Sequence, residues 1–517
     1  MPRKWLWLGG VIVLMVAMFI AAPELPPLTG RMASQAMAPD PTTAITRTYA
    51  AAAARHPTLT GIHSLSDGRS AFAARMLLIE SAQRSLDVQY YIWHDDVSGH
   101  LLFDALRRAD SRGVRVRLLL DDNGIAGLDP VLAALDALPN TEVRLYNPFQ
   151  QRRFKVLGYL TDFRRLNRRM HNKSLTADNA ATIIGGRNIG DEYFDAAEGV
   201  NFADLDMMAV GSVVTEVSSL FDRYWNSESS YPLSKLVRTA PESAQQQIFR
   251  KLGALGGEPE IRKYAAALKT SQIIANLRSG NFSFEWVPVK LLADAPEKTL
   301  AQGDDRTRTL MLPRLGNAIG KAENRLDLVS PYFVPMTEGT EAFAGMARKG
   351  VSIRVLTNSL SATDVSAVHA GYAKRRKALL VGGVRLFELK PDAAQGSGDV
   401  TSRGLGSSSA SLHAKTFAID GRRAFVGSFN FDPRSAEFNT EMGFVVESPK
   451  LARAIHDAFD SGLHKGSYEV RLDAAGNLEW IDRSSGTEVA WHEEPETGLL
   501  KRGLVTVLSW LPIDIML

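Results

Sequence analysis

The 517-residue chain contains no cysteine. That absence excludes disulfide bonds, thiolate-bound zinc, iron–sulfur clusters, a cysteine nucleophile and a lipid-modified cysteine anchor. Histidine is scarce as well, since ten residues are present with no HExxH pattern and no HxH pair among them. A histidine-rich metal site is therefore not expected. The chain is expected to work without a metal and without a cofactor.

An excess of charge of one sign is also missing. Lysine and arginine number 60 and aspartate and glutamate 57, which leaves a net charge of +3. This balance does not favour a dedicated nucleic-acid-binding protein. Apolar residues make up 45% and charged residues 23%, which excludes a wholly disordered or multi-span membrane chain. At ~100–200 residues per domain, the length predicts two or more compact units.

One uncharged apolar run, Trp5–Ala22, follows Arg3 and Lys4 at the start of the chain. At ~1.5 Å per residue a helix of this length spans about 27 Å, just enough to cross a bilayer. The basic flank predicts that the N-terminus stays in the cytoplasm and that the rest is exported. A cleaved signal peptide is the alternative for residues 1–22. Residues 23–60, rich in proline and alanine, are expected to be a linker that lifts the protein off the membrane.

The C-terminal extension, residues 471–517, ends in the apolar stretch Leu504–Leu517. This stretch is too short to span a bilayer and contains a proline. Trp510 and the preceding Lys501 and Arg502 favour a position at the bilayer interface. The alternative is a C-terminal element that packs on the protein.

An internal duplication organises the middle of the chain, with a spacing of about 240 residues. Four segments recur in the same order. The pairs are Ser85–Tyr91 with Arg325–Ser330, Gly113–Leu120 with Gly350–Leu356, Glu142–Tyr146 with Gly383–Phe387, and Met170–Lys173 with Leu412–Lys415. Short apolar strands alternate with segments of helical spacing in each half. We therefore expect an α/β fold of two duplicated domains, each a mixed sheet with helices on both faces, packed about a pseudo-twofold axis.

The expected boundaries follow from composition. Residues 61–231 form the first α/β domain and residues 281–470 the second. Between them, residues 232–280 are polar with helical spacing and are expected to be a helical connector.

One pattern, H-x-K-x4-D-x6-G-[GS]-x-N, occurs once in each half. Its polar members are His171, Lys173, Asp178 and Asn188 in the first half, and His413, Lys415, Asp420, Ser428 and Asn430 in the second. A histidine and a lysine two residues apart on a strand point to the same face. The small residues on the next strand let a phosphate approach the backbone. If the halves pack face to face, two imidazoles, two ammonium groups and two amides surround one phosphoryl group.

The two imidazoles are expected to divide the chemistry. One attacks phosphorus and forms a phosphohistidine, while the other protonates the leaving alcohol and then deprotonates the incoming alcohol or water. A nucleophilic imidazole needs an acceptor on its far ring nitrogen. We expect Glu441, and Asp206 in the corresponding place of the first half, to be the carboxylates that orient the two histidines.

These motifs resemble the phospholipase D superfamily, whose signature is this duplicated HKD motif, over about Gly61–Glu447. Several segments look like the bacterial cardiolipin synthase subgroup. They are Tyr90–Asp96, Asp121–Asn123, Tyr146–Phe149 and Gly186–Phe194. The resemblance implies that both HKD triads are catalytic, with His171 as the nucleophile and His413 as the general acid. Gly186 departs from the family pattern, which has serine there.

The resemblance implies a phosphatidyltransferase that moves a phosphatidyl group through His171 to the hydroxyl of phosphatidylglycerol, giving cardiolipin. Phospholipids and the membrane are the expected partners, with the catalytic part on the exported side of the bacterial inner membrane. Nucleic acid is not an expected partner, and the oligomeric state stays open. A hydrolytic phospholipase D that releases phosphatidic acid, a phosphodiesterase or nuclease, and a non-catalytic membrane scaffold are the alternatives.

A basic cluster precedes His171 in the sequence. It consists of Arg152, Arg153, Lys155, Arg164, Arg165, Arg168 and Arg169. One interpretation is a collar that attracts anionic headgroups. The other is the solvated face of a helix.

Overall fold

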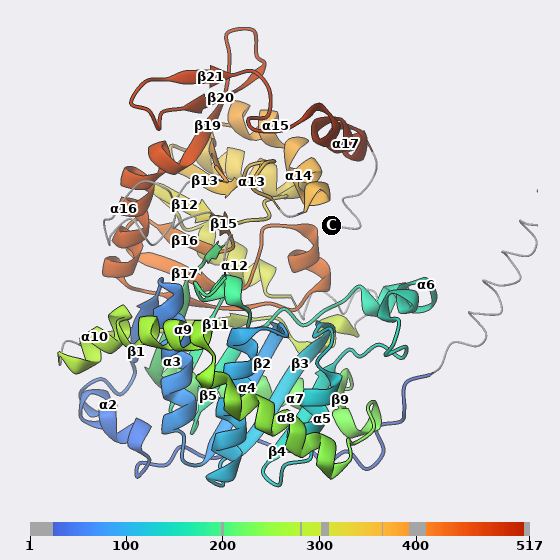
Figure 1. The fold of residues 1–517 in the computed structure, drawn as a ribbon. Coiled ribbons are helices and arrows are strands. Elements are labelled where there is room, and N and C mark those ends of the chain that lie inside the picture. The colour runs from blue at the N-terminus through green and yellow to red at the C-terminus, as the bar shows by residue number, and fades with distance from the viewer. Residues whose placement is uncertain are drawn as a thin grey trace, which may run out of the picture.

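The computed structural model describes residues 24–197, 201–279, 282–300, 310–363, 365–391 and 410–510. They form two α/β halves, with the first half in the lower part of Figure 1 and the second above it. The expected membrane segment, residues 1–22, lies outside the described residues. No helix within the described ranges is both long and apolar enough to cross a membrane.

The first half is built on a nine-stranded mixed sheet of order β10-β1-β8-β6-β5-β2-β3-β4-β9. Its strands are β1 (Thr60–Leu65), β2 (Ser85–Ile92), β3 (Arg115–Gly124), β4 (Thr141–Tyr146), β5 (Ser174–Ala177), β6 (Ala181–Gly185), β8 (Asp206–Gly211), β9 (Ser230–Pro232) and β10 (Glu285–Val287). Strands β2, β3 and β4 are parallel, and their neighbours on either side are antiparallel to them.

The second half is built on a ten-stranded sheet of order β11-β18-β17-β16-β12-β13-β14-β19-β20-β21. Its strands are β11 (Val289–Ala293), β12 (Arg325–Val329), β13 (Ser352–Asn358), β14 (Arg385–Leu389), β16 (Lys415–Ile419), β17 (Arg423–Gly427), β18 (Met442–Val446), β19 (Ser467–Leu472), β20 (Leu478–Asp482) and β21 (Val489–Trp491). The run β18-β17-β16-β12-β13-β14 repeats the order β8-β6-β5-β2-β3-β4 of the first sheet, with the same parallel core. The predicted duplication of an α/β unit is therefore confirmed.

Helices cover both faces of each sheet, as expected. They are α2 (Ala44–Arg55), α3 (Gly68–Ser81), α4 (Val97–Ser111), α5 (Asp129–Asp136), α6 (Lys155–Leu166), α7 (Ser212–Trp225), α8 (Glu242–Ala254), α9 (Pro259–Lys269), α10 (Gln272–Arg278), α12 (Leu312–Ile319), α13 (Met336–Arg348), α14 (Ser366–Ala373), α15 (Arg376–Val381), α16 (Pro449–Gly466) and α17 (Leu499–Trp510). Helices α3–α5 and α12–α15 enclose one apolar core on the outer side of each sheet. A third core contains α7, α16 and side chains of both sheets, and it joins the halves.

The joint between the sheets is Pro288. Strand β10 pairs with β1 at the edge of the first sheet, whereas β11 pairs with β18 in the second. The first half therefore extends to Val287, past the boundary expected at residue 281. One extended segment thus provides an edge strand to each sheet. Proline is well tolerated at the residue between the two strands because it has no N–H to donate to either ladder.

The segment before β1 is not the free linker expected for residues 23–60. The Arg31 guanidinium donates hydrogen bonds to the carbonyl oxygens of Asn226, which caps the end of α7, and of Ser230, the first residue of β9. The Ala36 amide donates to the Asp222 carboxylate. Each of these bonds joins a side chain to a backbone group far away in the sequence, and such contacts leave no periodic signal in the sequence.

The C-terminal apolar stretch folds in its described part as α17. Val505 is buried against α14, while Leu500, Leu504 and Trp510 are exposed. One side of the helix thus packs on the protein and the other carries the apolar surface expected at an interface. Residues 511–517 lie outside the described residues.

Candidate active site

His171 lies immediately before β5, in the seam between the two halves. Its backbone N–H donates to the Thr440 carbonyl at 2.9 Å. Its imidazole Nδ1 lies 2.8 Å from Oε2 of Glu441. Both partners belong to the second half, so the nucleophile expected in one half is oriented by the other.

His413 occupies the equivalent position before β16. Its backbone N–H donates to the Ala203 carbonyl at 2.9 Å, and its Nδ1 lies 2.6 Å from Oδ2 of Asp204. The strands that lead to these residues, β7 (Asn201–Ala203) and β15 (Ala410–Leu412), pair in parallel across the seam. This reciprocal exchange brings both histidines to the same seam.

The two lysines are buried beside the histidines. Nζ of Lys173 donates to the carbonyl of His171 at 2.7 Å, and Nζ of Lys415 lies 3.1 Å from Nδ1 of His413. Burial, with the charges of Lys173 and Lys415, lowers the pKa of the His171 imidazole well below its usual value. Burial and the same two charges, that of Lys415 first, lower the pKa of His413 to about 4. The charge of each lysine thus lowers the pKa of both imidazoles, as expected if the two halves share one site.

The two orienting carboxylates differ in their electrostatics. Burial raises the pKa of Glu441 to about 7, although Lys173 and the hydroxyls of Ser428 and Ser435 favour the ionised form. For Asp204, burial is outweighed by the charge and hydrogen bond of His413 and the charge of Lys415, so its pKa falls to about 2. His413 therefore faces a stably ionised carboxylate, whereas His171 faces one that also binds protons near neutrality.

Asp206 does not orient a histidine. Its carboxylate accepts a hydrogen bond from Arg75 at 2.8 Å, and both side chains are buried. The register explains the error, because Gly185 pairs with Asp206 where Gly427 pairs with Gly443. The counterpart of Glu441 is thus the residue two positions before Asp206, which is Asp204. This offset comes from strand pairing, and no motif in the sequence marks it.

Asp178 and Asp420 lie away from the seam. His171 precedes β5 and Asp178 follows it, so the four residues of this strand, roughly 13 Å at ~3.3 Å per residue, lie between them. The Asp178 carboxylate accepts hydrogen bonds from the backbone amides of residues 83, 84 and 85. Asp420 binds the amides of residues 323, 324 and 325 in the same way. The expectation that these two residues are catalytic is not supported, since each organises the loop that leads into the central parallel strand.

The three residues expected to bind substrate have different environments. Asn188 is engaged by the protein, because its Oδ1 accepts from the Ile92 amide and its Nδ2 donates to the Tyr193 hydroxyl. Ser428 donates to Oε2 of Glu441. Asn430 is buried, and its Oδ1 has no hydrogen-bond partner among the described residues. Of the three, Asn430 has the buried polar atom that a ligand would satisfy.

Aromatic rings pack against both histidines. The Tyr91 ring meets His171 edge-on with centroids 4.9 Å apart. Phe202 stacks on His413 at 5.2 Å, and Tyr193 meets the same imidazole edge-on at 5.1 Å. Periodicity in the sequence did not single out these contacts, because they depend on how the segments are brought together.

Part of the basic cluster before His171 is neutralised within the protein. Arg152 and Lys155 both bind the buried carboxylate of Asp122. The buried guanidinium of Arg169 pairs with Asp121 at 2.6 Å. The collar interpretation therefore does not hold for these three residues, whose charges organise the loop that leads to His171.

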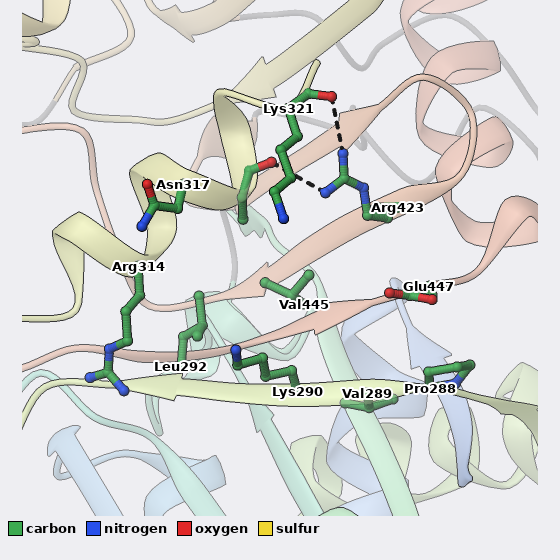
Figure 2. A pocket seen from close by; sticks show the side chains of 11 residues that line it. Pro288, Val289, Lys290, Leu292, Arg314, Asn317, Lys321, Arg423, Val445 and Glu447 are labelled. Atoms are coloured by element: carbon green, nitrogen blue, oxygen red, sulfur yellow. Dashed lines mark hydrogen bonds between the residues drawn. The ribbon is translucent and has the colours of Figure 1, made fainter. Parts of the chain in front are cut away.

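A separate hollow of about 300 Å³ lies on the second half, between α12 and the edge of the sheet (Figure 2). Arg423 lines it and donates to the carbonyl oxygens of Ala318 and Lys321 at the end of α12. None of the histidines and lysines of the two motifs lines this hollow, so it is distinct from the seam.

Comparison with known proteins agrees with this geometry. The family model described as cardiolipin synthase, PLD-like domain, matches residues 76–225 and 315–463. The chain belongs to the phospholipase D-like cardiolipin synthase family. The predicted resemblance to that family is therefore confirmed, and each matched segment contains one HKD motif of this family member.

Similar proteins cover nearly the whole chain. Cardiolipin synthase C of Escherichia coli (strain K12) is 47% identical over 464 residues, which cover 90% of this chain and 97% of that protein. An uncharacterized protein of Helicobacter pylori (strain 26695) is 33% identical over 420 residues, 80% of this chain and 81% of that one. A crystal structure of phosphatidylserine synthase from Haemophilus influenzae Rd KW20 shares the fold, with a TM-score of 0.56 and 14% identity over 91% of this chain and 99% of that chain.

Proposed function

We propose that this chain is a phospholipase D-type phosphatidyltransferase that forms cardiolipin from two phospholipids, with phosphatidylglycerol as the acceptor. One observation carries the proposal. A single seam contains two imidazoles, and the Nδ1 atoms of His171 and His413 are each bound to a carboxylate. This arrangement leaves the Nε2 atom of each ring for chemistry.

In the first step, Nε2 of His171 attacks the phosphorus of the donor lipid. The bond from phosphorus to the headgroup oxygen breaks, and Nε2–H of His413 gives that oxygen its proton. The product is a phosphatidyl group joined to His171 through a P–N bond. The buried ammonium groups of Lys173 and Lys415 stabilise the charge that develops on the phosphoryl oxygens.

In the second step, the primary hydroxyl of the acceptor lipid gives its proton to His413 and attacks phosphorus. The P–N bond breaks, and its electron pair returns to Nε2 of His171. Cardiolipin leaves, and His413 again carries the proton for the next turnover.

The electrostatics support an unprotonated nucleophile at His171. A nucleophilic imidazole must be unprotonated, and the pKa of His171 is lowered well below its usual value by burial and by the two lysines. Burial and the two lysines also lower the pKa of His413, to about 4, so its protonated form depends on the 2.6 Å contact with the ionised carboxylate of Asp204 and on the negative charge of a bound phosphodiester.

The membrane is the proposed site of action. The substrates are bilayer lipids, and Trp5–Ala22 has the length and flanking charge of a single anchor. We place the catalytic halves on the exported side of the inner membrane. Protease added to spheroplasts should then digest both halves, whereas protected halves would place them in the cytoplasm.

Reconstitution tests the reaction. The full-length chain is placed in vesicles that contain phosphatidylglycerol with a labelled phosphatidyl group, and products are separated by chromatography. We expect labelled cardiolipin from the wild type and a loss of orders of magnitude in His171→Ala and His413→Ala. Release of labelled phosphatidic acid without cardiolipin would instead identify a hydrolytic phospholipase D.

A further inference from the structure

Helix α6 has an inverted amphipathic pattern. A helix on the surface of a soluble protein normally turns its apolar stripe inward and its polar face outward. Val156 and Leu160 of α6 are 78% and 72% exposed, and Phe154, Leu157 and Phe163 are exposed as well. Val156 and Leu160 have the i, i+4 spacing of one helical face, and the exposed Phe163 follows a kink in the helix at Asp162.

The other face of α6 carries the polar anchors. Nζ of Lys155 donates to Oδ1 of Asp122 at 2.8 Å, and the Tyr159 hydroxyl donates to Oδ1 of Asn123 at 3.0 Å. Leu166, at the end of the helix, is fully buried. The protein thus binds α6 through its polar groups and leaves its apolar groups to solvent, which suits a surface that meets an apolar medium.

The helix is also tied to the catalytic histidine. Nδ2 of Asn123, whose Oδ1 binds Tyr159, donates to the Tyr91 hydroxyl at 3.2 Å. The Tyr91 ring packs edge-on against His171. At the C-terminal end of the helix, Arg434 of the second half donates to Oδ1 of Asn167 at 2.7 Å. The apolar face of α6 therefore has a defined position relative to the seam.

We propose that α6 is a docking helix that inserts Val156, Leu160 and Phe163 into the interface of an anionic bilayer and so places the catalytic seam at the lipid headgroups. The inference rests on the proposed function, because phospholipid substrates have to reach His171 from the bilayer.

Charge favours an anionic bilayer over a second copy of the chain. Arg153 and Arg164 are exposed near the two ends of the helix, and the acidic Asp162 is paired with Arg165 at 2.6 Å. Basic residues beside an inserted apolar face are attracted to anionic headgroups. In a twofold interface between copies, the same positive groups would face each other and repel. Helix α17, which also exposes apolar side chains, lies on the same side of the molecule as α6 in Figure 1, as one bilayer-facing side would require.

The absence of cysteine makes a direct test possible, because one introduced cysteine carries one label. Leu160→Cys is labelled with an environment-sensitive dye in the full-length chain, in vesicles of phosphatidylglycerol and phosphatidylethanolamine. Val381→Cys is the matched control, since Val381 is 72% exposed at the end of α15. We expect blue-shifted emission and quenching by spin-labelled lipids at position 160 but not at 381. Equal quenching at both positions would overturn the proposal, as would a blue shift at 160 that depends on protein concentration in detergent without lipid.

Activity supplies an independent readout. The double variant Val156→Glu with Leu160→Glu should lower the rate of phosphatidyl transfer in vesicles by roughly 10-fold or more, because charged groups resist insertion. The rate on phospholipid dispersed in detergent micelles should stay close to that of the wild type. An equal loss in both media would contradict docking. If the wild type formed no cardiolipin in either medium, the proposed function would fail, while the fluorescence experiment would still decide whether α6 inserts.

Discussion

Glu441 and His171 are 270 residues apart in the chain, yet Oε2 of Glu441 lies 2.8 Å from Nδ1 of His171. Asp204 holds His413 in the same way across 209 residues. Neither half contains a complete histidine–carboxylate pair, since each half provides a histidine and the carboxylate for the other. The two halves of the duplicated fold therefore build one candidate site together.

Exchanging Asp204 for asparagine should separate orientation from folding. We expect Asp204→Asn to lower kcat by about 10²–10⁴-fold, because the amide no longer stabilises a protonated His413 or fixes its tautomer. The fold should persist, as judged by thermal unfolding. Asp206→Asn is the matched control. It leaves the buried Arg75 guanidinium without its charge partner, which should cost about 3–5 kcal/mol of unfolding free energy while the folded fraction keeps its kcat. A large loss of kcat in Asp206→Asn together with a normal kcat in Asp204→Asn would refute the assignment of Asp204.

The roles of the two histidines can be separated with an activated substrate. A p-nitrophenyl phosphodiester has a leaving group that needs no proton, so His413→Ala should still release a burst of one p-nitrophenol per site and accumulate the phosphohistidine. His171→Ala should show no burst, because it lacks the attacking nitrogen. Rapid-mixing absorbance and acid-labile labelling of the protein measure the two events. A burst that appears in His171→Ala but not in His413→Ala would mean that His413 is the nucleophile and His171 the proton donor.

The aspartates of the two motifs should matter for stability and little for turnover. Asp178→Ala removes a buried acceptor from three backbone amides, which should cost at least about 1–3 kcal/mol of unfolding free energy. The kcat of the folded protein should stay within a few-fold of wild type. Denaturant unfolding and active-site-normalised kinetics check both statements. A loss of several orders of magnitude in kcat with unchanged stability would restore a catalytic role for Asp178.

Asp420 should make stability depend on acid pH. Its pKa is lowered by hydrogen bonds from the amides of Arg325, Glu323 and Asn324, although partial burial opposes this. A folded-state pKa below the unfolded value of about 3.9 stabilises the protein above that pH, and the contribution is lost as pH falls through the folded pKa. The difference in unfolding free energy between wild type and Asp420→Asn should therefore be full above about pH 5 and shrink on acidification. A difference in unfolding free energy between the two proteins that stays constant with pH would contradict this prediction.

Gly186 should not tolerate the serine that the resemblance leads one to expect. A Cβ atom at this position would lie 2.3 Å from Oδ1 of Asp204, so the carboxylate would have to move away from His413. We expect Gly186→Ser to lower kcat by roughly 10-fold or more, as displaced catalytic groups do. In the second half the longer Glu441 accommodates Ser428 and accepts its hydrogen bond. The double variant Gly186→Ser with Asp204→Glu tests this explanation, because it should recover part of the lost activity. No loss in Gly186→Ser would show that the glycine is unimportant.

The α/β fold and the two HKD motifs were accessible from the sequence because both depend on local patterns that occur twice. A histidine and a lysine two residues apart on a strand share a face whatever else the chain does. Repetition in the same order then distinguished these residues from ordinary surface polar groups. The sequence led to Asp206 and missed Asp204, because the two residues have the same parity on the approach to β8 and strand register is not visible in one sequence.

Local pattern alone was therefore enough to establish that the chain is a duplicated α/β protein with paired histidines and lysines suited to phosphoryl transfer. Long-range packing decided which carboxylate serves which histidine, that Asp178 and Asp420 organise loops, and that α6 turns its apolar side outward. The physical reason is that strand alternation is set within a few residues, whereas these contacts join groups hundreds of residues apart and form only when the two sheets share a core.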